Sequence, residues 1–294
     1  YRGIRMAGYR LPLEFAEELV KTVAADRGKR RISSLCRSVY WQKAAEGLAD
    51  VSRAVVVSGF YIPSAGAPET DGPGGAVILA RALSRHGAET EIWTDGFCLE
   101  AMRACASAAG FPEEKVAAAD RFDMLDSFAP GAVVFTERLG RAADGKYYNM
   151  KSEDISNWTP SLDWFSVLSS RKGIFTVGIG DGGNEVGMGN LISEICDIRP
   201  DYRKCLSVIR TDVAIPADVS NWGCYALSAA LSHIWGEWCG PCSGDERAML
   251  EALVGKNVVD GISKKPELTV DGFGIEANEE IIAGLYEIWN KFRS

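Results

Sequence analysis

The chain has 294 residues, of which 47% are hydrophobic and 24% charged, proportions typical of a soluble globular protein. Its formal net charge of −8, with no long basic segment, argues against nucleic acid as the main partner. No run of about 18 apolar residues occurs, so the sequence predicts no membrane-spanning helix and no membrane partner.

Helices are expected over 13–25 and 33–48, ahead of a region in which strands and helices alternate. In that region strands are predicted over 53–58, 90–94, 132–136, 174–177 and 206–213. The other helices are predicted over 73–86, 97–109, 162–170, 185–196, 221–235, 245–254 and 276–292. Alternation at this spacing predicts a three-layer, Rossmann-like α/β sandwich with a mainly parallel sheet. We expect a single domain over 1–294, in which the helices of residues 1–50 pack on an α/β core of residues 51–294.

Residues 176–190 are the most informative segment, because this predicted strand-to-helix turn holds six glycines and two carboxylates. Glycines in such a turn let the backbone approach a ligand and expose N–H groups that favour anions. Asp181 and Glu185 place negative charge at the same position, and a divalent cation would reconcile the two features. The alternative is a tight turn in which Asp181 caps a helix.

The same glycines match a nucleotide-binding pattern in part. Gly178, Gly180 and Gly183 satisfy G-x-G-x-x-G, but Asp181 lies inside the loop, where it would repel a pyrophosphate. No Gly-Lys-Ser or Gly-Lys-Thr follows the glycines, which excludes a P-loop. No nucleotide cofactor is therefore expected.

Three polar loops each follow a predicted strand, and they comprise residues 68–75, residues 137–149 and the glycine-rich turn. Ligands of open parallel sheets bind at the carboxyl ends of the strands, so we expect these loops to meet in one pocket. That pocket would set five carboxylates against two arginines: Glu69, Asp71, Glu137, Asp181 and Glu185 against Arg138 and Arg141. Hard oxygen ligands of this kind suit Mg²⁺ or Mn²⁺. The alternative is three separate solvated loops that cap helices.

The cysteines and the basic residues receive structural interpretations. Eight cysteines spread along the chain form no disulfide scaffold and indicate a reducing compartment. Residues 238–242, Trp-Cys-Gly-Pro-Cys, match the thioredoxin active site, but they fall between two predicted helices, which favours a turn without redox function. Ser243 is expected to cap the second of these helices. The basic run over 27–31 is expected to be a solvated helix end.

Four motifs stand in one order along the chain, over residues 69–73, 137–150, 178–189 and 219–223. Together they resemble the C-terminal domain family of the D-glutamate cyclases, and the resemblance runs from about residue 53 to residue 261. It implies that D-glutamate closes to 5-oxo-D-proline with loss of water, a hydro-lyase reaction. Two departures leave a different activity open: the separate first domain of the eukaryotic two-domain cyclases has no counterpart in this sequence, and the Cys239–Cys242 turn is not part of the pattern.

This chemistry suggests a role for each group of polar residues. A base must deprotonate the α-amine, and a metal or an arginine must neutralise the γ-carboxylate. The candidate catalytic residues are Asp181, Glu185 and Arg141. The candidate metal ligands are Glu69, Asp71, Asp181 and Glu185. The candidate substrate-binding residues are Arg138, Gly180, Gly182, Gly183, Asn184, Thr70, Asn149 and Asn221.

Two other functions use the same residues and stay open from the sequence. An acidic metal cluster with arginines also describes a metal-dependent phosphomonoester phosphatase. A non-catalytic ligand-binding domain is the other alternative, since a fold by itself says little about function. Every reading expects a small anionic partner, an amino acid or a phosphate ester, and leaves a homo-oligomer open. The expected location is the cytoplasm, or the mitochondrial matrix if the chain comes from a eukaryotic two-domain protein.

Overall fold

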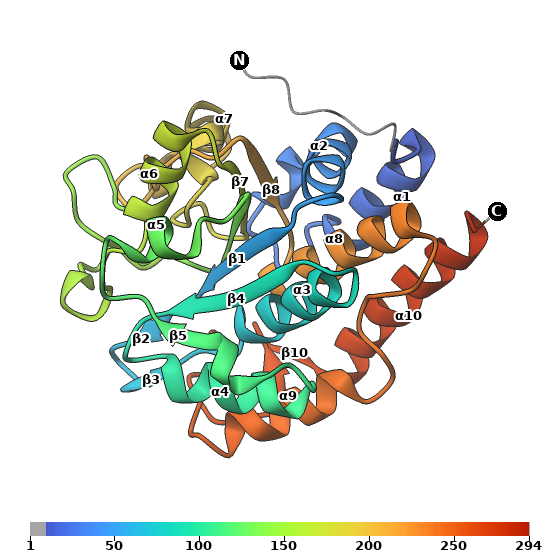
Figure 1. Ribbon diagram of the computed structural model, residues 1–294. Helices are drawn as coiled ribbons and strands as arrows, with labels where there is room; N and C mark the ends of the chain where they lie inside the picture. Colours follow the sequence, from blue (N-terminus) through green and yellow to red (C-terminus); the bar gives the residue numbers. More distant parts are fainter. Residues whose placement is uncertain (1–9, 294) are drawn as a thin grey trace.

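Six parallel strands form the central sheet of the computed structural model, which describes residues 10–293 (Figure 1). The strands are β1 (Arg53–Ser58), β4 (Glu89–Thr94), β5 (Val116–Ala118), β6 (Ala132–Thr136), β7 (Phe175–Gly180) and β8 (Val213–Pro216). They lie in the order β5-β4-β1-β6-β7-β8. From β1 the chain first adds β4 and β5 on one side, and then crosses to the other side of β1 to add β6, β7 and β8. The reversal in strand order therefore lies between the neighbouring strands β1 and β6. Ligands of open α/β sheets bind at the carboxyl ends of the strands beside such a reversal.

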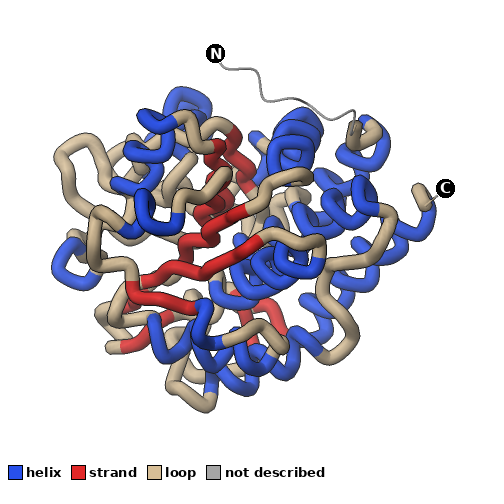
Figure 2. Tube along the Cα trace, viewed as in Figure 1, coloured by secondary structure: helices blue, strands red, loops and turns tan. Residues whose placement is uncertain are grey.

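Helices cover both faces of the sheet, which confirms the three-layer α/β class (Figure 2). Ala54 and Val56 of β1 pack into one apolar core, and the alternating Val55 and Val57 pack into a second. The first core includes residues of α1 (Leu13–Val23), α2 (Ser38–Leu48), α3 (Pro73–Arg85), α4 (Leu99–Ala108), α8 (Ser220–Trp235), α9 (Asp245–Val254) and α10 (Ile275–Lys291). The second includes residues of α5 (Met124–Phe128) and α6 (Trp164–Lys172). The N-terminal α1 and α2 therefore share the first core with the strands.

The shorter elements lie at the edges of these layers. Helix α7 (Ile192–Ile198) packs in a third apolar cluster. Two small antiparallel pairs join β2 (Tyr61–Ile62) to β3 (Ala67–Pro68) and β9 (Thr269–Val270) to β10 (Phe273–Gly274). Single 3₁₀ turns span Ser33–Leu35, Glu113–Lys115, Ser156–Trp158, Met188–Leu191 and Pro200–Tyr202. Among the described residues, no helix has both the length and the apolar character needed to cross a membrane.

The helix predicted over 185–196 is wrong in its first half. Gly187 has φ of 100°, in the left-handed region, so the chain turns there and α7 begins only at Ile192. A Cβ at Gly178 or Gly189 would strike the backbone carbonyl of Val186 or Ile209, respectively. These glycines therefore allow the loop to pack on itself, and α7 begins only after it.

Three further features differ from the predictions. The strand predicted over 206–213 is shifted, because β8 begins only at Val213. The segment before β8 runs beside the glycine-rich loop instead. There the carbonyl oxygen of Ile209 accepts the N–H groups of Gly187 and Gly189 at 3.0 and 3.1 Å. Strand β5 was not predicted. The Cys239–Cys242 segment does lie in the turn between α8 and α9, with Cys239 buried and Cys242 exposed, but Gly244 rather than Ser243 precedes α9.

Candidate functional site

A cavity of about 390 Å³ opens at the carboxyl ends of the strands, beside the reversal between β1 and β6. Most of its charged lining residues are acidic: Glu69, Glu137, Glu153, Asp181, Glu185 and Asp271. The cationic side chains that line it are Arg30, Lys151 and Lys264. The segments that carry these residues come from both ends of the chain, so the cavity depends on the complete fold.

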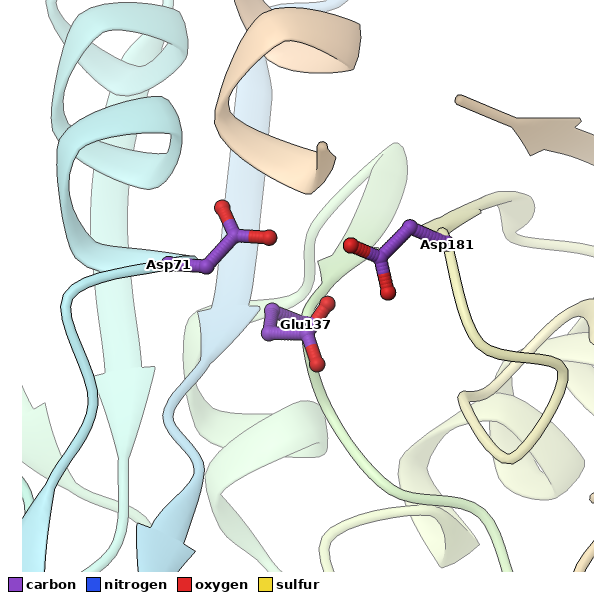
Figure 3. Close-up of side chains that lie close together, drawn as sticks. All are labelled: Asp71, Glu137 and Asp181. Carbon is purple, nitrogen blue, oxygen red and sulfur yellow. The ribbon is translucent and has the colours of Figure 1, made fainter. Parts of the chain in front are cut away.

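Three buried carboxylates lie together at this cavity (Figure 3). Asp71, Glu137 and Asp181 each offer one oxygen, and the three oxygens lie within 4.8 Å of one another. Asp71 precedes α3, whereas Glu137 and Asp181 directly follow β6 and β7, so neighbouring strand ends bring the triad together. The expected proximity of Asp71 and Asp181 is thus present, with Glu137 between their loops.

Asp71 is held by the N-terminus of α8. Its carboxylate accepts the backbone N–H groups of Ser220 at 2.9 Å and Asn221 at 2.8 Å. In return, the side-chain oxygen of Asn221 accepts the N–H groups of Gly72 at 3.0 Å and Gly75 at 2.6 Å. This exchange caps α3 and α8 reciprocally and fixes the direction of the Asp71 carboxylate. Asn221 and Thr70, which we expected to bind substrate, lie behind the cavity and do not line it.

Glu137 adopts a strained backbone conformation directly after β6. Its φ is 44°, in the left-handed region that residues other than glycine seldom occupy, at a typical cost of about 1–3 kcal/mol. The Ser220 hydroxyl donates to its Oε2 at 2.6 Å. Burial raises the pKa of Glu137 well above its ordinary value, and the charges of Asp181 and Glu185 act in the same direction.

Asp181 has one paired and one unpaired oxygen. Its Oδ1 forms an ion pair with the Arg30 guanidinium, whereas its Oδ2 is buried and has no hydrogen-bond partner among the described residues. Burial raises the pKa of Asp181, and the nearby Arg30 charge opposes that rise only in part. An unpaired carboxylate oxygen beside two further carboxylates is the kind of group that a cation would satisfy.

Glu185 turns back into its own loop. Its carboxylate accepts the N–H groups of Asp181 at 3.3 Å, Gly182 at 2.7 Å and Gly183 at 2.8 Å. These N–H groups, which we expected to bind an anionic substrate, already bind an anion of the protein. Of the loop residues predicted to bind substrate, Asn184 lines the cavity, whereas Gly180, Gly182 and Gly183 do not.

The two predicted arginines point away from the cavity. Arg138 is 1% exposed, forms an ion pair with Asp95 and donates to the carbonyl oxygen of Gly59 at 2.8 Å. The Nε of Arg141 lies 3.2 Å from Asp163 Oδ2. Neither lines the cavity, because local carboxylates hold both. The predicted Asn149 does line it, and its side chain donates to Glu153 Oε2 at 2.6 Å.

Arg30, Lys264 and Asp271 line the cavity and were missed by sequence analysis. The prediction that the basic run over 27–31 is a solvated helix end is wrong for Arg30. Its Nη2 lies 2.8 Å from Asp271 Oδ2, and its Nη1 forms an ion pair with Asp181. Asp271 and Gly272, with φ of 51° and 80°, make the turn between β9 and β10. An Asp-Gly pair between Val270 and Phe273 is a hairpin signal, so the turn was readable from the sequence, but its position at the cavity was not.

Negative charge exceeds positive charge at this site. Burial raises the pKa of Glu69 well above its ordinary value and that of Asp71 to about 7, and the charge of Asp271 adds to both. The buried triad of Asp71, Glu137 and Asp181 could bind a metal ion, since three carboxylates with one unpaired oxygen form the hard donor set that Mg²⁺ and Mn²⁺ prefer.

Comparison with known proteins places these residues in one matched region. The family model "D-glutamate cyclase-like, C-terminal" matches residues 19–286, which include every cavity residue described above. The chain is also similar to the mitochondrial D-glutamate cyclase of Homo sapiens, with 29% identity over 339 residues. That alignment covers 92% of this chain and 51% of the human protein, so the chain spans about half the length of this relative.

Proposed function

Because the chain belongs to the D-glutamate cyclase-like, C-terminal family, we propose that it is a hydro-lyase that converts D-glutamate to 5-oxo-D-proline and water. The observation that carries this proposal is the extent of the family match, whose bounds, residues 19–286, enclose all the segments that build the acidic cavity. A cavity of about 390 Å³ suits a small amino acid.

The reaction sets clear demands on the site. The α-nitrogen forms a bond to the γ-carbon, and one γ-oxygen leaves as water. Two protons must leave the α-ammonium group, and the departing oxygen must gain two. A carboxyl group that can accept and return protons near neutral pH would serve both steps. Because both reacting groups belong to one molecule, holding the substrate bent supplies much of the rate.

We assign the proton transfers to Glu69. It is 7% exposed, lines the cavity, and its carboxylate has no hydrogen-bond partner among the described residues. Burial and the charges of Asp271 and Asp71 raise its pKa, which moves it toward the range that a group acting as both base and acid requires. Glu185 is less suited to this role, because three backbone N–H groups occupy its carboxylate.

Arg30 and Lys264 would orient the substrate. Both line the cavity, and a glutamate that enters it presents two carboxylates to them. Asp71, Glu137 and Asp181 would hold Mg²⁺ or Mn²⁺. When bound, such an ion supplies positive charge that neutralises a substrate carboxylate and stabilises developing negative charge. The phosphatase alternative gains no support, since Arg141, its expected phosphate ligand, lies outside the cavity lining.

The proposal is tested with purified protein that has been stripped by a chelator and resupplied with Mg²⁺ or Mn²⁺. D-glutamate, L-glutamate and a generic phosphomonoester are supplied in parallel, and 5-oxoproline and free phosphate are measured. We expect 5-oxo-D-proline from D-glutamate alone. Released phosphate with no 5-oxoproline would replace the cyclase with a phosphatase. Glu69→Gln should lose turnover, whereas Glu251→Gln on the exposed side of α9 should retain it.

A further inference from the structure

A second cavity, of about 520 Å³, lies at the other end of α8. It is bounded by the turn that joins α8 to α9 and by one side of α10, which runs past α9 (Figure 1). The acidic site adjoins Ser220 at the first residue of α8, and the 16 residues of that helix span roughly 24 Å. The two cavities are therefore separate, and the mechanism proposed above makes no use of the second.

Aromatic rings form one wall of this second cavity. Trp238 and Tyr286 both line it, and their ring centroids lie 5.2 Å apart with the planes at 79°. Trp289 extends the aromatic group, with its ring centroid 5.7 Å from that of Trp238. Tyr286 is 45% exposed, so its ring is open to a ligand. Ring faces of this kind attract cations, and the attraction is strongest for tryptophan.

The remaining polar groups of the second cavity are acidic. Glu246 is 2% exposed, its Oε2 accepts the Tyr225 hydroxyl at 2.6 Å, and its Oε1 has no partner among the described residues. Glu279 lines the same cavity, whose lining includes no lysine, arginine or histidine from the part of the chain that the structure describes. Arg81, a basic residue beside the turn, forms an ion pair with Asp245, and the Arg293 guanidinium lies over the Trp289 ring, 4.9 Å from its centroid. Burial raises the pKa of Glu246 to about 7, as expected for a carboxyl group without a counter-charge.

We propose that this second cavity binds a small organic ammonium ion with an apolar substituent. The Trp238 and Tyr286 rings would contact the cation and Glu246 and Glu279 would balance its charge, while Ile282 and Ala283 supply apolar contacts to the substituent. An inorganic metal ion is a poorer match, because aromatic and aliphatic side chains form most of the wall.

Choline and its uncharged isostere 3,3-dimethylbutan-1-ol separate charge from shape, so their binding to the purified chain is compared by titration calorimetry. We expect saturable binding of choline that is roughly fivefold to tenfold tighter than that of the alcohol. Choline should also slow alkylation of Cys242, the exposed cysteine of the cavity wall. Equal binding of the two probes, or no saturable binding of choline at millimolar concentration, would overturn the proposal.

Variants locate the binding. Trp238→Leu and Glu246→Gln should each weaken choline binding by about fivefold or more, whereas Trp158→Leu and Glu251→Gln should not. Should Trp238→Leu fail to fold, Tyr286→Leu on the exposed side of α10 replaces it, with Tyr286→Phe as the control that keeps the ring. Asp181→Asn should leave choline binding unchanged. Choline binding that survives Trp238→Leu or Tyr286→Leu, or that is lost in Asp181→Asn, would show that the ion binds elsewhere.

Discussion

Within the triad of Asp71, Glu137 and Asp181, Asp181 is the residue with a fully buried carboxylate oxygen that lacks a hydrogen-bond partner among the described residues. Backbone N–H groups hold Asp71 and Glu185, and a hydroxyl group holds Glu137, whereas Asp181 Oδ2 is buried without a partner among the described residues. Asp181 Oδ2 is thus available to bind a substrate or a metal, whereas hydrogen bonds already orient the carboxylates of Asp71, Glu137 and Glu185.

Asp181→Asn should lower turnover of D-glutamate by about 100-fold or more, because it removes a charge that a metal and the reaction need while it preserves the side-chain shape. Steady-state rates at saturating substrate and metal measure the effect. Thermal unfolding followed by circular dichroism serves as the control for folding. Full activity in this variant would place the chemistry outside the triad.

Glu246 predicts how stability depends on pH. Its folded-state pKa of about 7 exceeds its ordinary value of 4.5, so the folded protein holds this proton more tightly than the unfolded chain does. The associated stability is fully present below pH 4.5 and is lost as the pH rises to 7. Relative to Glu246→Gln, the wild type should lose about 3 kcal/mol of unfolding free energy across that interval. Urea unfolding at several pH values tests this, and parallel curves for the two proteins would contradict it.

At the scale of elements, reciprocal capping ties α3 to α8. The N-termini of both helices approach the triad. Asp71, in the loop before α3, caps α8, and Asn221, in the first turn of α8, caps α3. The contact between α3 and α8 therefore positions Asp71 as well as stabilising the fold.

Asn221→Ala should destabilise the protein by about 1–3 kcal/mol, because it leaves the buried N–H group of Gly75 without an acceptor and removes one of the two acceptors of the Gly72 N–H group. It should also raise the metal concentration needed for half-maximal activity, since Asp71 would lose its alignment. Asn290→Ala, on the exposed side of α10, should change stability by less than about 0.5 kcal/mol. Equal effects of the two substitutions would rule out the capping role.

The turn between α8 and α9 is expected to play no part in turnover. A double variant, Cys239→Ser with Cys242→Ser, should keep D-glutamate activity within about tenfold of the wild type, because the turn lies at the end of α8 remote from the triad. Assays run with and without a reductant provide the comparison. A greater loss in a folded protein would restore a redox role for the pair.

For the whole molecule, binding of a metal ion at the triad would be linked to folding. The triad gathers residues from three loops, so an ion that binds them stabilises the folded state and has no equivalent site in the unfolded chain. Mg²⁺ or Mn²⁺ at 100 times its dissociation constant should add about 2.7 kcal/mol to the unfolding free energy of the stripped protein. Differential scanning fluorimetry should show a rise in Tm that Asp181→Asn abolishes, whereas an unchanged Tm would argue against a metal at the triad.

Local pattern alone predicted most of the secondary structure and part of the site. The alternation of apolar strands with amphipathic helices predicts the parallel sheet, and strand ends of such a sheet lie together, which brings Asp71 near Asp181. The helix predicted over 185–196 is wrong because the pattern of apolar residues there does not reveal the left-handed φ of Gly187.

Tertiary structure decided which charged side chains face the cavity. Arg30 and Asp271 lie 241 positions apart, and no local pattern relates them, yet they form an ion pair beside Asp181. Conversely, Arg138 follows a strand end as a site residue should, but Asp95 and backbone carbonyl groups draw it into the core. Residue type and spacing determine which chemical groups are present. The direction of a long charged side chain depends instead on the partners that the rest of the chain places around it, because a buried charge is stable only where it is paired.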